Sequence, residues 1–455
     1  MSPLTYQQAL DYLYSFVDYS LTRQLQYSPE KFDLGRMRAF LELLGNPHLK
    51  YPTVHVAGTK GKGSTAAMIA SILQAAGYKV GFYSSPHLED FVERIQINQV
   101  PLSHEALAEL VDDVRPFVAQ IERLTTFEIT TAIAFLAFLR AGVDVAVIEV
   151  GLGGRLDATN LVQPEVSVIT SISYDHMKVL GESLGQIARE KAGIIKHHTP
   201  VVVAPQRQEA LAVIREVAAG LSAPLVLVGD DYRYRVGIHS LDGQAFWVWK
   251  AADQPRVDEW IENGSEQFEP LRFEMPLLGA HQVDNAATAF AVADILRLRD
   301  WEISDAAIAD GFRRVKWPGR FEVLHREPYL VVDSAHNQDS ALKLRLALED
   351  YFPGKRAILI LGASEDKDIE GILRELLPKV KTVIATQSFH PRAMNPEVLV
   401  QLVHRFGYPG RVVVPVEEAL AYAMNQVEGD SLVLATGSLF IAAAVRQTWR
   451  EHFRV

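Results

Sequence analysis

A glycine-rich segment between a β-rich run and a helix-forming run constrains the fold of this chain more than any other feature. Residues 53–57 favour a short strand, and residues 58–64 contain three glycines. Residues 65–76 then favour a helix that Gly77 ends, and residues 79–83 favour a second strand. This order of strand, loop, helix and strand predicts an α/β unit with a parallel sheet.

Further apolar runs extend the predicted sheet. Residues 145–148, 166–172 and 201–204 read as strands buried on both faces, separated by stretches of helical length. Residues 5–44 read as helical, with an irregular stretch near residues 27–32. The first half of the chain is therefore expected to be a parallel-sheet domain.

Two departures from this pattern indicate the domain organisation. Residues 232–273 are rich in aromatic and polar side chains, and Asp242-Gly243 favours a hairpin turn, which predicts a small antiparallel β addition. Residues 313–320 are basic and turn-rich, and the α/β pattern restarts beyond them. The later strands are expected at residues 329–333, 356–361, 381–386, 411–414 and 431–436.

We therefore expect an α/β protein with two domains. Residues 1–310 would form an N-terminal P-loop ATPase-type parallel-sheet domain with the β addition at about residues 230–275. Residues 311–455 would form a C-terminal Rossmann-like doubly wound domain. The length of 455 residues fits two or three domains.

Composition excludes several functional classes. The net charge of −11 disfavours general binding to nucleic acids or anionic membranes, which need a basic surface. The absence of cysteine excludes disulfides, thiolate metal sites and a cysteine nucleophile, and it fits a reducing cytosol. We expect neither a signal peptide at residues 1–18 nor a transmembrane helix, because no uncharged apolar run of about 18 residues occurs.

The glycine-rich segment has the composition of a phosphate-binding loop. Backbone N–H groups freed by glycine can surround phosphate oxygens at a helix N-terminus, and Lys62 would reach the β- and γ-phosphates. The spacing departs from the common Walker pattern, because Gly58 is only three residues before Gly61 and Gly63 separates Lys62 from Ser64. A plain glycine-rich turn is the alternative reading.

Polar residues follow several of the predicted strands. Glu149 ends a buried apolar strand, where a Mg²⁺-linked carboxylate is placed in phosphate-loop enzymes; a solvated strand-end carboxylate is the alternative. Asp175 and His176 follow the next strand, and a lone histidine is more often structural than a ligand. Taken alone, Lys191 reads as a helix-surface lysine.

The C-terminal half repeats this placement. Residues 333–337, 362–368 and 436–438 each follow a predicted strand, at the sheet edge where open α/β sheets bind ligands. Ordinary loop and helix-capping roles are the alternative reading for each segment.

Together and in this order, the motifs resemble the folylpolyglutamate synthase/dihydrofolate synthase family, within the Mur-type ligases. The matching segments are residues 58–64, 84–88, 149–160, 175–176, 190–194, 279–286, 317–322, 333–337, 366–368 and 436–439. They span nearly the whole chain.

The resemblance implies an ATP-dependent ligase. A folate or pteroate carboxylate attacks the γ-phosphate of ATP to give an acyl phosphate, and the amine of L-glutamate then displaces phosphate to form an amide. Because two anions must approach each other, Mg²⁺ and lysine have to screen their charge. The implied substrates are dihydropteroate, folates such as tetrahydrofolate, L-glutamate and ATP.

The resemblance also implies roles for individual residues. The phosphate holders are Gly61, Lys62, Gly63 and Ser64, and the nucleotide contacts are Asn285, Arg320 and Asp333. Ser85 and Glu149 match ligands of one Mg²⁺, and His176 matches the ligand of a second. Lys191 matches a lysine that is carbamylated in the family.

Substrate residues are implied in the same way. The pterin-binding segments match Asp33, Leu34 and Gly35, then Thr126, Phe127 and Glu128, then Leu156, Asp157 and Ala158. Their presence favours a bifunctional enzyme. His336 and Ser438 are the candidates for the glutamate subsite. The chain departs from the family at Lys60, where asparagine is usual, at Ser334, where glycine is usual, and at Met177, where threonine is frequent.

Three alternatives follow. The chain could extend folates only, or it could be a Mur-type ligase of cell-wall assembly with the same chemistry and a UDP-sugar peptide substrate. A nucleotide switch is a third class, but the Asn-Lys-x-Asp guanine motif is missing from the sequence. We expect a cytoplasmic monomer without nucleic-acid or membrane partners.

Overall fold

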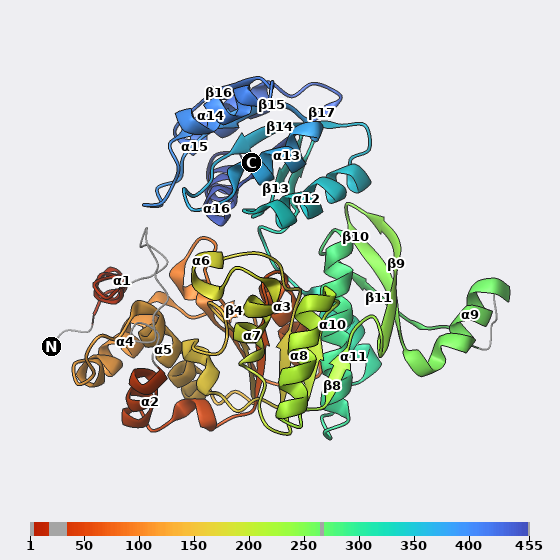
Figure 1. Cartoon of the computed structure of the whole chain (residues 1–455). Coiled ribbons are helices and arrows are strands. Elements are labelled where there is room, and N and C mark those ends of the chain that lie inside the picture. The colour runs from red at the N-terminus through yellow and green to blue at the C-terminus, as the bar shows by residue number, and fades with distance from the viewer. Residues whose placement is uncertain (1–3, 18–33, 264–267, 454–455) are drawn as a thin grey trace.

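The computed structural model describes residues 4–17, 34–263 and 268–453. Asp33 lies outside the described residues. Two lobes are visible in Figure 1. The first two sheets with their helices form what we call the N-terminal lobe. The last sheet with its helices forms the C-terminal lobe.

The sheet of the N-terminal lobe has eight strands in the order β4-β3-β2-β5-β1-β6-β7-β8. The parallel strands are β2 (Val80–Tyr83), β5 (Val145–Glu149), β1 (Thr53–Ala57), β6 (Val166–Ile169), β7 (Val201–Val203) and β8 (Leu225–Leu227). The short strands β3 (Ile95–Ile97) and β4 (Val100–Pro101) extend it antiparallel. The predicted parallel sheet is thus confirmed, although β6 ends at Ile169 rather than at Ile172.

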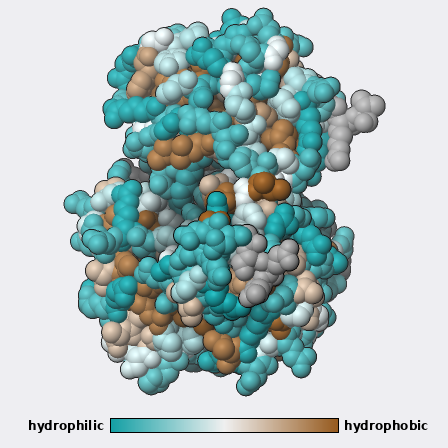
Figure 2. Space-filling view, turned by 90° about the vertical axis from the view of Figure 1, so that its right-hand side faces the viewer, coloured by the Kyte–Doolittle hydropathy of each residue, from teal (hydrophilic) through white to brown (hydrophobic). Residues whose placement is uncertain are grey.

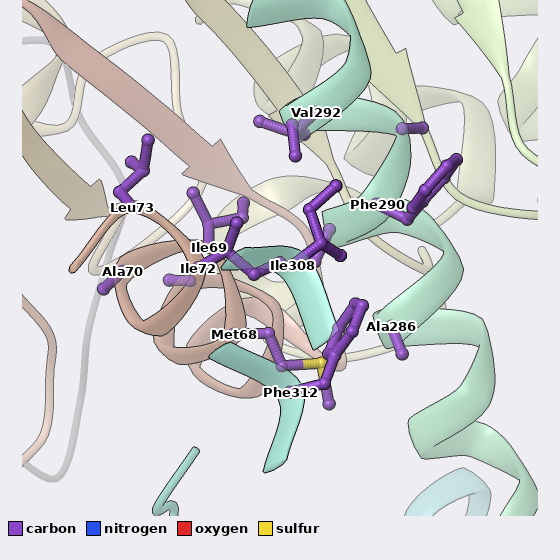
Figure 3. Packing of buried hydrophobic residues seen from close by; sticks show 14 of the residues in the cluster. Met68, Ile69, Ala70, Ile72, Leu73, Ala286, Phe290, Val292, Ile308 and Phe312 are labelled. Atoms are coloured by element: carbon purple, nitrogen blue, oxygen red, sulfur yellow. The ribbon is translucent and has the colours of Figure 1, made fainter. Parts of the chain in front are cut away.

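Helices cover both faces of this sheet because alternate residues of the buried strands point to opposite sides. On one face, Val145 and Val147 pack with α3 (Lys62–Ala75), α10 (Ala280–Arg297) and α11 (Asp305–Arg314). Figure 3 shows Met68, Phe290 and Phe312 from these three helices within this cluster.

On the other face, Ala146 and Ile148 pack with four helices. These helices are α1 (Tyr6–Tyr14), α2 (Leu34–Leu43), α4 (His104–Val118) and α5 (Thr126–Ala141). The short α6 (Met177–Leu180), with α7 (Leu184–Ala192) and α8 (Gln208–Gly220), forms a separate buried cluster.

The small antiparallel addition is confirmed. Its three strands are β9 (Tyr232–Ser240), β10 (Gly243–Lys250) and β11 (Leu271–Met275), in the order β11-β10-β9. Helix α9 (Gln254–Asn263) lies between β10 and β11 in sequence and projects to the right in Figure 1. Phe246 of β10 contacts Phe312, which fixes the small sheet to the core.

The C-terminal lobe contains six strands in the order β12-β13-β17-β14-β15-β16. Their bounds are β12 (Glu322–Arg326), β13 (Tyr329–Val332), β17 (Ser431–Thr436), β14 (Arg356–Leu361), β15 (Val380–Ala385) and β16 (Gly410–Val412). Strand β12 is antiparallel to β13 and was not predicted, because as a half-exposed edge strand it lacks a continuous apolar run. The other five are parallel.

The helices of this lobe cover both faces of its sheet, which confirms the doubly wound prediction. Helices α12 (Gln338–Tyr351), α13 (Ile369–Leu376) and α14 (Pro396–Arg405) contribute to one buried cluster. Helices α15 (Val416–Asn425) and α16 (Leu439–Thr448) contribute to the other. Across the described part of the chain, every helix is too short or too polar to cross a membrane.

Candidate active site

The glycine-rich loop joins β1 to α3 and its glycines are required sterically. Gly61 caps α3 with a left-handed φ of 85°. A Cβ at Gly58 would lie 1.8 Å from Thr170 Oγ1, and a Cβ at Gly61 would lie 2.2 Å from Asn285 Oδ1. A Cβ at Gly63 would meet the ring of Trp317 at 2.4 Å. The loop is thus enclosed by side chains from later parts of the chain.

Glu149, the last residue of β5, lies beside this loop. Its carboxylate is 3.9 Å from Lys62 Nζ and accepts a long hydrogen bond of 3.4 Å from the N–H of Ser85. Burial raises the pKa of Glu149, and the charge of Lys62 opposes that rise. A buried carboxylate whose contacts within the described residues are all long has room for a cation. The structure therefore brings together Ser85, Lys62 and Glu149.

Lys191 is not the surface lysine that its local sequence suggests. Its side chain is buried, and Nζ donates a hydrogen bond of 2.8 Å to the carbonyl oxygen of Gly58. Burial, and then the charge of Lys62, lower the pKa of Lys191 to about 7. Helix α7 therefore places an amine that is partly deprotonated at neutral pH beside the glycine-rich loop.

Asp175 is the centre of a cluster to which both lobes contribute. Its carboxylate lies 3.1 Å from Lys60 Nζ and 3.2 Å from Lys367 Nζ, and Asn337 Nδ2 donates to it at 3.3 Å. Burial alone would raise the pKa of Asp175, but hydrogen bonding and the charges of Lys60 and Lys367 hold it well below its usual range. Asp175 is therefore ionised at neutral pH.

His336 joins the same cluster. Its Nδ1 lies 2.9 Å from the carbonyl oxygen of Ser334, which can only accept, so Nδ1 carries the hydrogen. The ammonium of Lys60 and then burial lower the pKa of His336 to about 4. The neutral Nε2 then accepts a hydrogen bond of 3.2 Å from Lys60 Nζ.

His176 follows Asp175 at the entrance to α6. It has a left-handed φ of 50°, and 43% of its side chain is exposed. Partial desolvation lowers the pKa of His176 to about 4, and the charge of Asp175 opposes this shift. A neutral, accessible imidazole can accept a metal ion.

The predicted nucleotide contacts lie around the loop. Asn285 of α10 faces Gly61, as its steric relation to a Cβ there shows. Arg320 donates to the carbonyl oxygen of Gly319 at 3.1 Å and to the hydroxyl of Ser334. Asp333 already accepts from the N–H groups of Phe321 and Ala335, at 2.8 and 2.7 Å. Asp333 thus has a structural function in addition to any ligand role.

The described pterin-binding candidates lie together in the N-terminal lobe. Arg36 of α2 pairs with Glu128 of α5 at 3.4 Å, next to Leu34 and Gly35 at the start of α2. Phe127 of α5 meets the loop after β5, where a Cβ on Gly151 would lie 2.5 Å from its ring. That loop leads into Leu156, Asp157 and Ala158.

Several of these side chains have clear structural partners. Thr126 donates to the carbonyl oxygen of Leu13 at 2.9 Å. Glu128 Oε2 accepts from the N–H and the hydroxyl of Thr125, completing a capping box. Asp157 caps a 3₁₀ turn through Thr159 and accepts from Leu152 N–H at 2.9 Å.

The glutamate candidates His336 and Ser438 lie in the segments that follow the adjacent strands β13 and β17 of the C-terminal lobe. The N–H of Gly437 donates to the carbonyl oxygen of Ala335 at 3.0 Å, so the segments carrying Ser438 and His336 are neighbours. Ser438 also caps α16 by accepting from Ile441 N–H at 3.2 Å. Figure 2 shows the molecule narrowing between the two lobes.

Sequence reasoning missed the contacts between distant segments. Trp317 lies in one of the matching segments, but no local signal in the sequence places its ring over Gly63. Lys367 and Asn337 each follow a predicted strand, and their shared contact with Asp175 has no local sequence signal. The contact of Lys60 with Asp175 has none either.

Comparison with known proteins agrees with this fold. Residues 56–293 match the Mur ligase middle domain, and residues 319–439 match the Mur ligase glutamate ligase domain. The parallel sheet with its glycine-rich loop and the second doubly wound lobe are thus those of a Mur ligase.

Individual relatives show to which family within the Mur ligases the chain belongs. The chain is 35% identical to the dihydrofolate synthase/folylpolyglutamate synthase of Bacillus subtilis, over 91% of this chain and 94% of the relative. It is 34% identical to the folylpolyglutamate synthase of Lacticaseibacillus casei, over 98% and 99% of the two chains. The chain belongs to the dihydrofolate synthase/folylpolyglutamate synthase family of Mur ligases.

Two further comparisons add detail. The crystal structure of Mycobacterium tuberculosis folylpolyglutamate synthase, complexed with ADP and AMPPCP, matches with a TM-score of 0.81 and 32% identity, covering 91% of this chain and 94% of that one. The chain spans about half the length of archaeal relatives from Haloferax volcanii and Halobacterium salinarum, 51% and 49%. Both are named probable bifunctional folylpolyglutamate synthase/dihydropteroate synthase.

Proposed function

We propose that this protein is an ATP-dependent ligase that joins L-glutamate to dihydropteroate and to the glutamate tail of tetrahydrofolate, through an acyl phosphate. The observation that carries the proposal is that Glu149 and Lys191 both contact the glycine-rich loop that carries Lys62. The same loop contacts His336 of the C-terminal lobe through Lys60. The names of the Bacillus subtilis and Lacticaseibacillus casei relatives support the choice of substrates.

The glycine-rich loop would hold the phosphates of ATP. The N–H groups at the start of α3, including those of Gly61, Lys62, Gly63 and Ser64, provide donors at a helix N-terminus. Lys62 adds a positive charge where the β- and γ-phosphates would lie. Asn285 and Arg320 would contact the nucleotide from the other side of the loop, and Asp333 would contact the ribose.

The residues present fit magnesium. Within the described residues, no group of three or more His, Asp or Glu side chains is arranged as a metal site. Mg²⁺ does not need one, because it is commonly held by one or two carboxylates together with substrate phosphates and water. Ser85 and Glu149 would hold one ion, and His176 would hold a second. When bound, the ions supply positive charge that lets the substrate carboxylate approach the γ-phosphate.

Lys191 would act next to this site in carbamylated form. Carbamylation requires a neutral amine, and a pKa of about 7 provides one at physiological pH. The product would replace a buried cation with an anion close to Lys62. This change suits a site that collects positive charge.

The other lobe would provide the glutamate subsite. His336 and Ser438 lie on adjacent segments at the edge of its sheet that faces the loop. The pterin would bind at Asp33–Gly35, 126–128 and 156–158 in the N-terminal lobe. We also propose the domain boundary near residue 310, a monomeric state and a cytoplasmic location.

The test is ATP-dependent phosphate release by the purified protein with Mg²⁺ and L-glutamate, adding either dihydropteroate or tetrahydrofolate. We expect release with each substrate and none when glutamate is omitted. The Lys62→Ala variant is the matched control for contaminating ATPases. If a protein that still binds AMPPCP releases no phosphate with either substrate, the result would contradict the proposal and favour a UDP-muramyl substrate.

One observation favours a narrower second candidate, a ligase that only extends folates. The carboxylates of Glu128 and Asp157 are both engaged in helix capping, which leaves less of each for a pterin. The Lacticaseibacillus casei relative is named for polyglutamylation alone. Release with tetrahydrofolate but not with dihydropteroate would decide for this candidate.

A further inference from the structure

The Asp175 carboxylate connects the glycine-rich loop to the C-terminal lobe through side chains alone. Oδ2 contacts Lys60 of the loop at 3.1 Å, and Oδ1 contacts Lys367 of the other lobe at 3.2 Å. One anion in the N-terminal lobe is therefore shared by a cation from each lobe.

Further contacts make the connection specific. Asn337 donates to Oδ2 of Asp175 at 3.3 Å, and Lys60 donates across the lobes to Nε2 of His336 at 3.2 Å. Lys60 therefore joins the loop to the C-terminal lobe directly as well as through Asp175.

Burial makes these contacts sensitive to the loss of a partner. The side chains of Lys60, Asp175 and Lys367 are only 13, 10 and 15% exposed. Removing one member of a buried charge cluster leaves the others uncompensated, which is strongly destabilising for the arrangement that buries them. The docked lobes would then separate to hydrate the remaining charges.

We propose that Asp175 is a positioning residue that couples the conformation of the glycine-rich loop to the docking of the C-terminal lobe, with Lys60 as the link on the loop. A nucleotide in the loop fixes the backbone at Lys60 and so favours the docked arrangement. Because such coupling is reciprocal, docking also raises the affinity of the loop for nucleotide.

Lys60 is the part of this link that a single substitution can remove. An asparagine at this position would be shorter and neutral, so it could not place a positive charge next to Asp175 and His336. The backbone of Lys60 is held separately, because its N–H donates to the carbonyl oxygen of Ser171 at 3.0 Å. The substitution Lys60→Asn therefore removes the link without removing the loop.

The lobes are also joined by contacts that do not involve the loop. Glu89 of the N-terminal lobe pairs with Arg446 of α16. His239 of β9 pairs with Asp350 of α12 at 3.0 Å. The Glu89→Gln variant is thus a control that weakens docking without touching the link to the loop.

Distance measurement between spin labels tests the proposal. The chain has no cysteine, so the exposed residues Glu122 and Gln401, one in each lobe, can be replaced by cysteine and labelled. In this background, adding AMPPCP with Mg²⁺ is expected to shorten the mean distance between the two spin labels and to narrow its distribution. In the Lys60→Asn and Asp175→Asn variants the distribution should stay broad with and without AMPPCP. Glu89→Gln should broaden it while keeping the response to nucleotide.

A conservative variant separates charge from structure. Lys60→Arg keeps the positive charge and should retain the response, whereas Lys60→Asn should bind AMPPCP at least about fivefold more weakly, the lower end of typical coupling. If Asp175→Asn does not fold, Lys60→Asn and Lys367→Gln decide the question. A parent-like response to AMPPCP in folded Lys60→Asn would overturn the proposal.

The measurement does not depend on the proposed reaction. It uses only AMPPCP and Mg²⁺, so absence of glutamate ligation would leave its result interpretable. Conversely, normal ligation with an unresponsive distance in the parent protein would reject the coupling and keep the ligase.

Discussion

Lys191 Nζ lies 2.8 Å from the carbonyl oxygen of Gly58, so a buried amine contacts the first residue of the glycine-rich loop. The two residues are 133 positions apart in the chain. Their contact places an amine with a pKa of about 7 beside the proposed phosphate site.

Replacing Lys191 with Met should stabilise the protein most at low pH. The folded pKa is about 7 and the reference value is 10.5. Below pH 7 the lysine is charged in both states, so its burial opposes folding fully. Between pH 7 and 10.5 the unfolded state binds more protons than the folded state. The destabilisation caused by burying Lys191 therefore decreases as pH rises.

Urea unfolding of parent and Lys191→Met protein across pH 6 to 10, without bicarbonate, measures this effect. The gain from the substitution should shrink as pH increases. The exposed Lys50→Met variant serves as the control and should show no such trend. A gain that is independent of pH would contradict the assigned shift in pKa.

Gly63→Ala should weaken nucleotide binding through Trp317. The added Cβ would lie 2.4 Å from the indole ring, so either the loop or the ring must move. We expect AMPPCP affinity to fall at least about tenfold, or about 1.4 kcal/mol. Calorimetric titration measures it.

The double variant Gly63→Ala/Trp317→Leu should recover part of that affinity, because the smaller side chain makes room for the methyl group. Gly220→Ala is the matched control, since a Cβ there meets nothing within 4 Å. Equal losses in the single and double variants would show that the ring is not the obstacle.

Glu149→Gln should lower phosphate release about 100-fold or more, as expected for loss of a charged group that stabilises the reacting phosphate. The fold should persist, because the contacts of Glu149 with other described residues are long, at 3.4 and 3.9 Å. The dependence of the rate on Mg²⁺ concentration is the measurement. Glu165→Gln, on the protein surface, is the control, and an unchanged Mg²⁺ dependence in Glu149→Gln would count against the metal role.

Phe127→Ala should affect dihydropteroate more than tetrahydrofolate if the pterin pocket is used only in the first reaction. The KM for dihydropteroate should rise by about tenfold, the upper end for loss of one aromatic pair. Parallel assays with both substrates measure the ratio. Leu139→Ala, at an exposed position of the same helix, is the control, and an equal change for both substrates would indicate one shared pocket.

Local patterns were sufficient for much of the fold and for the position of the glycine-rich loop between a strand and a helix. The apolar runs at Val145–Glu149 and Ser431–Thr436 are buried on both faces, so their sequence directly records their environment. Edge strand β12 is partly exposed to solvent, so its composition is mixed and did not predict a strand. The three glycines of the loop can be read in the sequence, but the side chains that exclude a Cβ at each of them, those of Thr170, Asn285 and Trp317, meet the loop only in the folded protein.

The sequence by itself determined which chemical groups this protein has and at which strand ends they lie. Only the tertiary structure decided the environment of those groups. Lys191 and Lys60 look like ordinary lysines in sequence, because a pKa depends on burial and on charges brought close by folding. The Asp175 cluster was likewise decided by packing, since its members come from four segments that meet only when the two lobes dock.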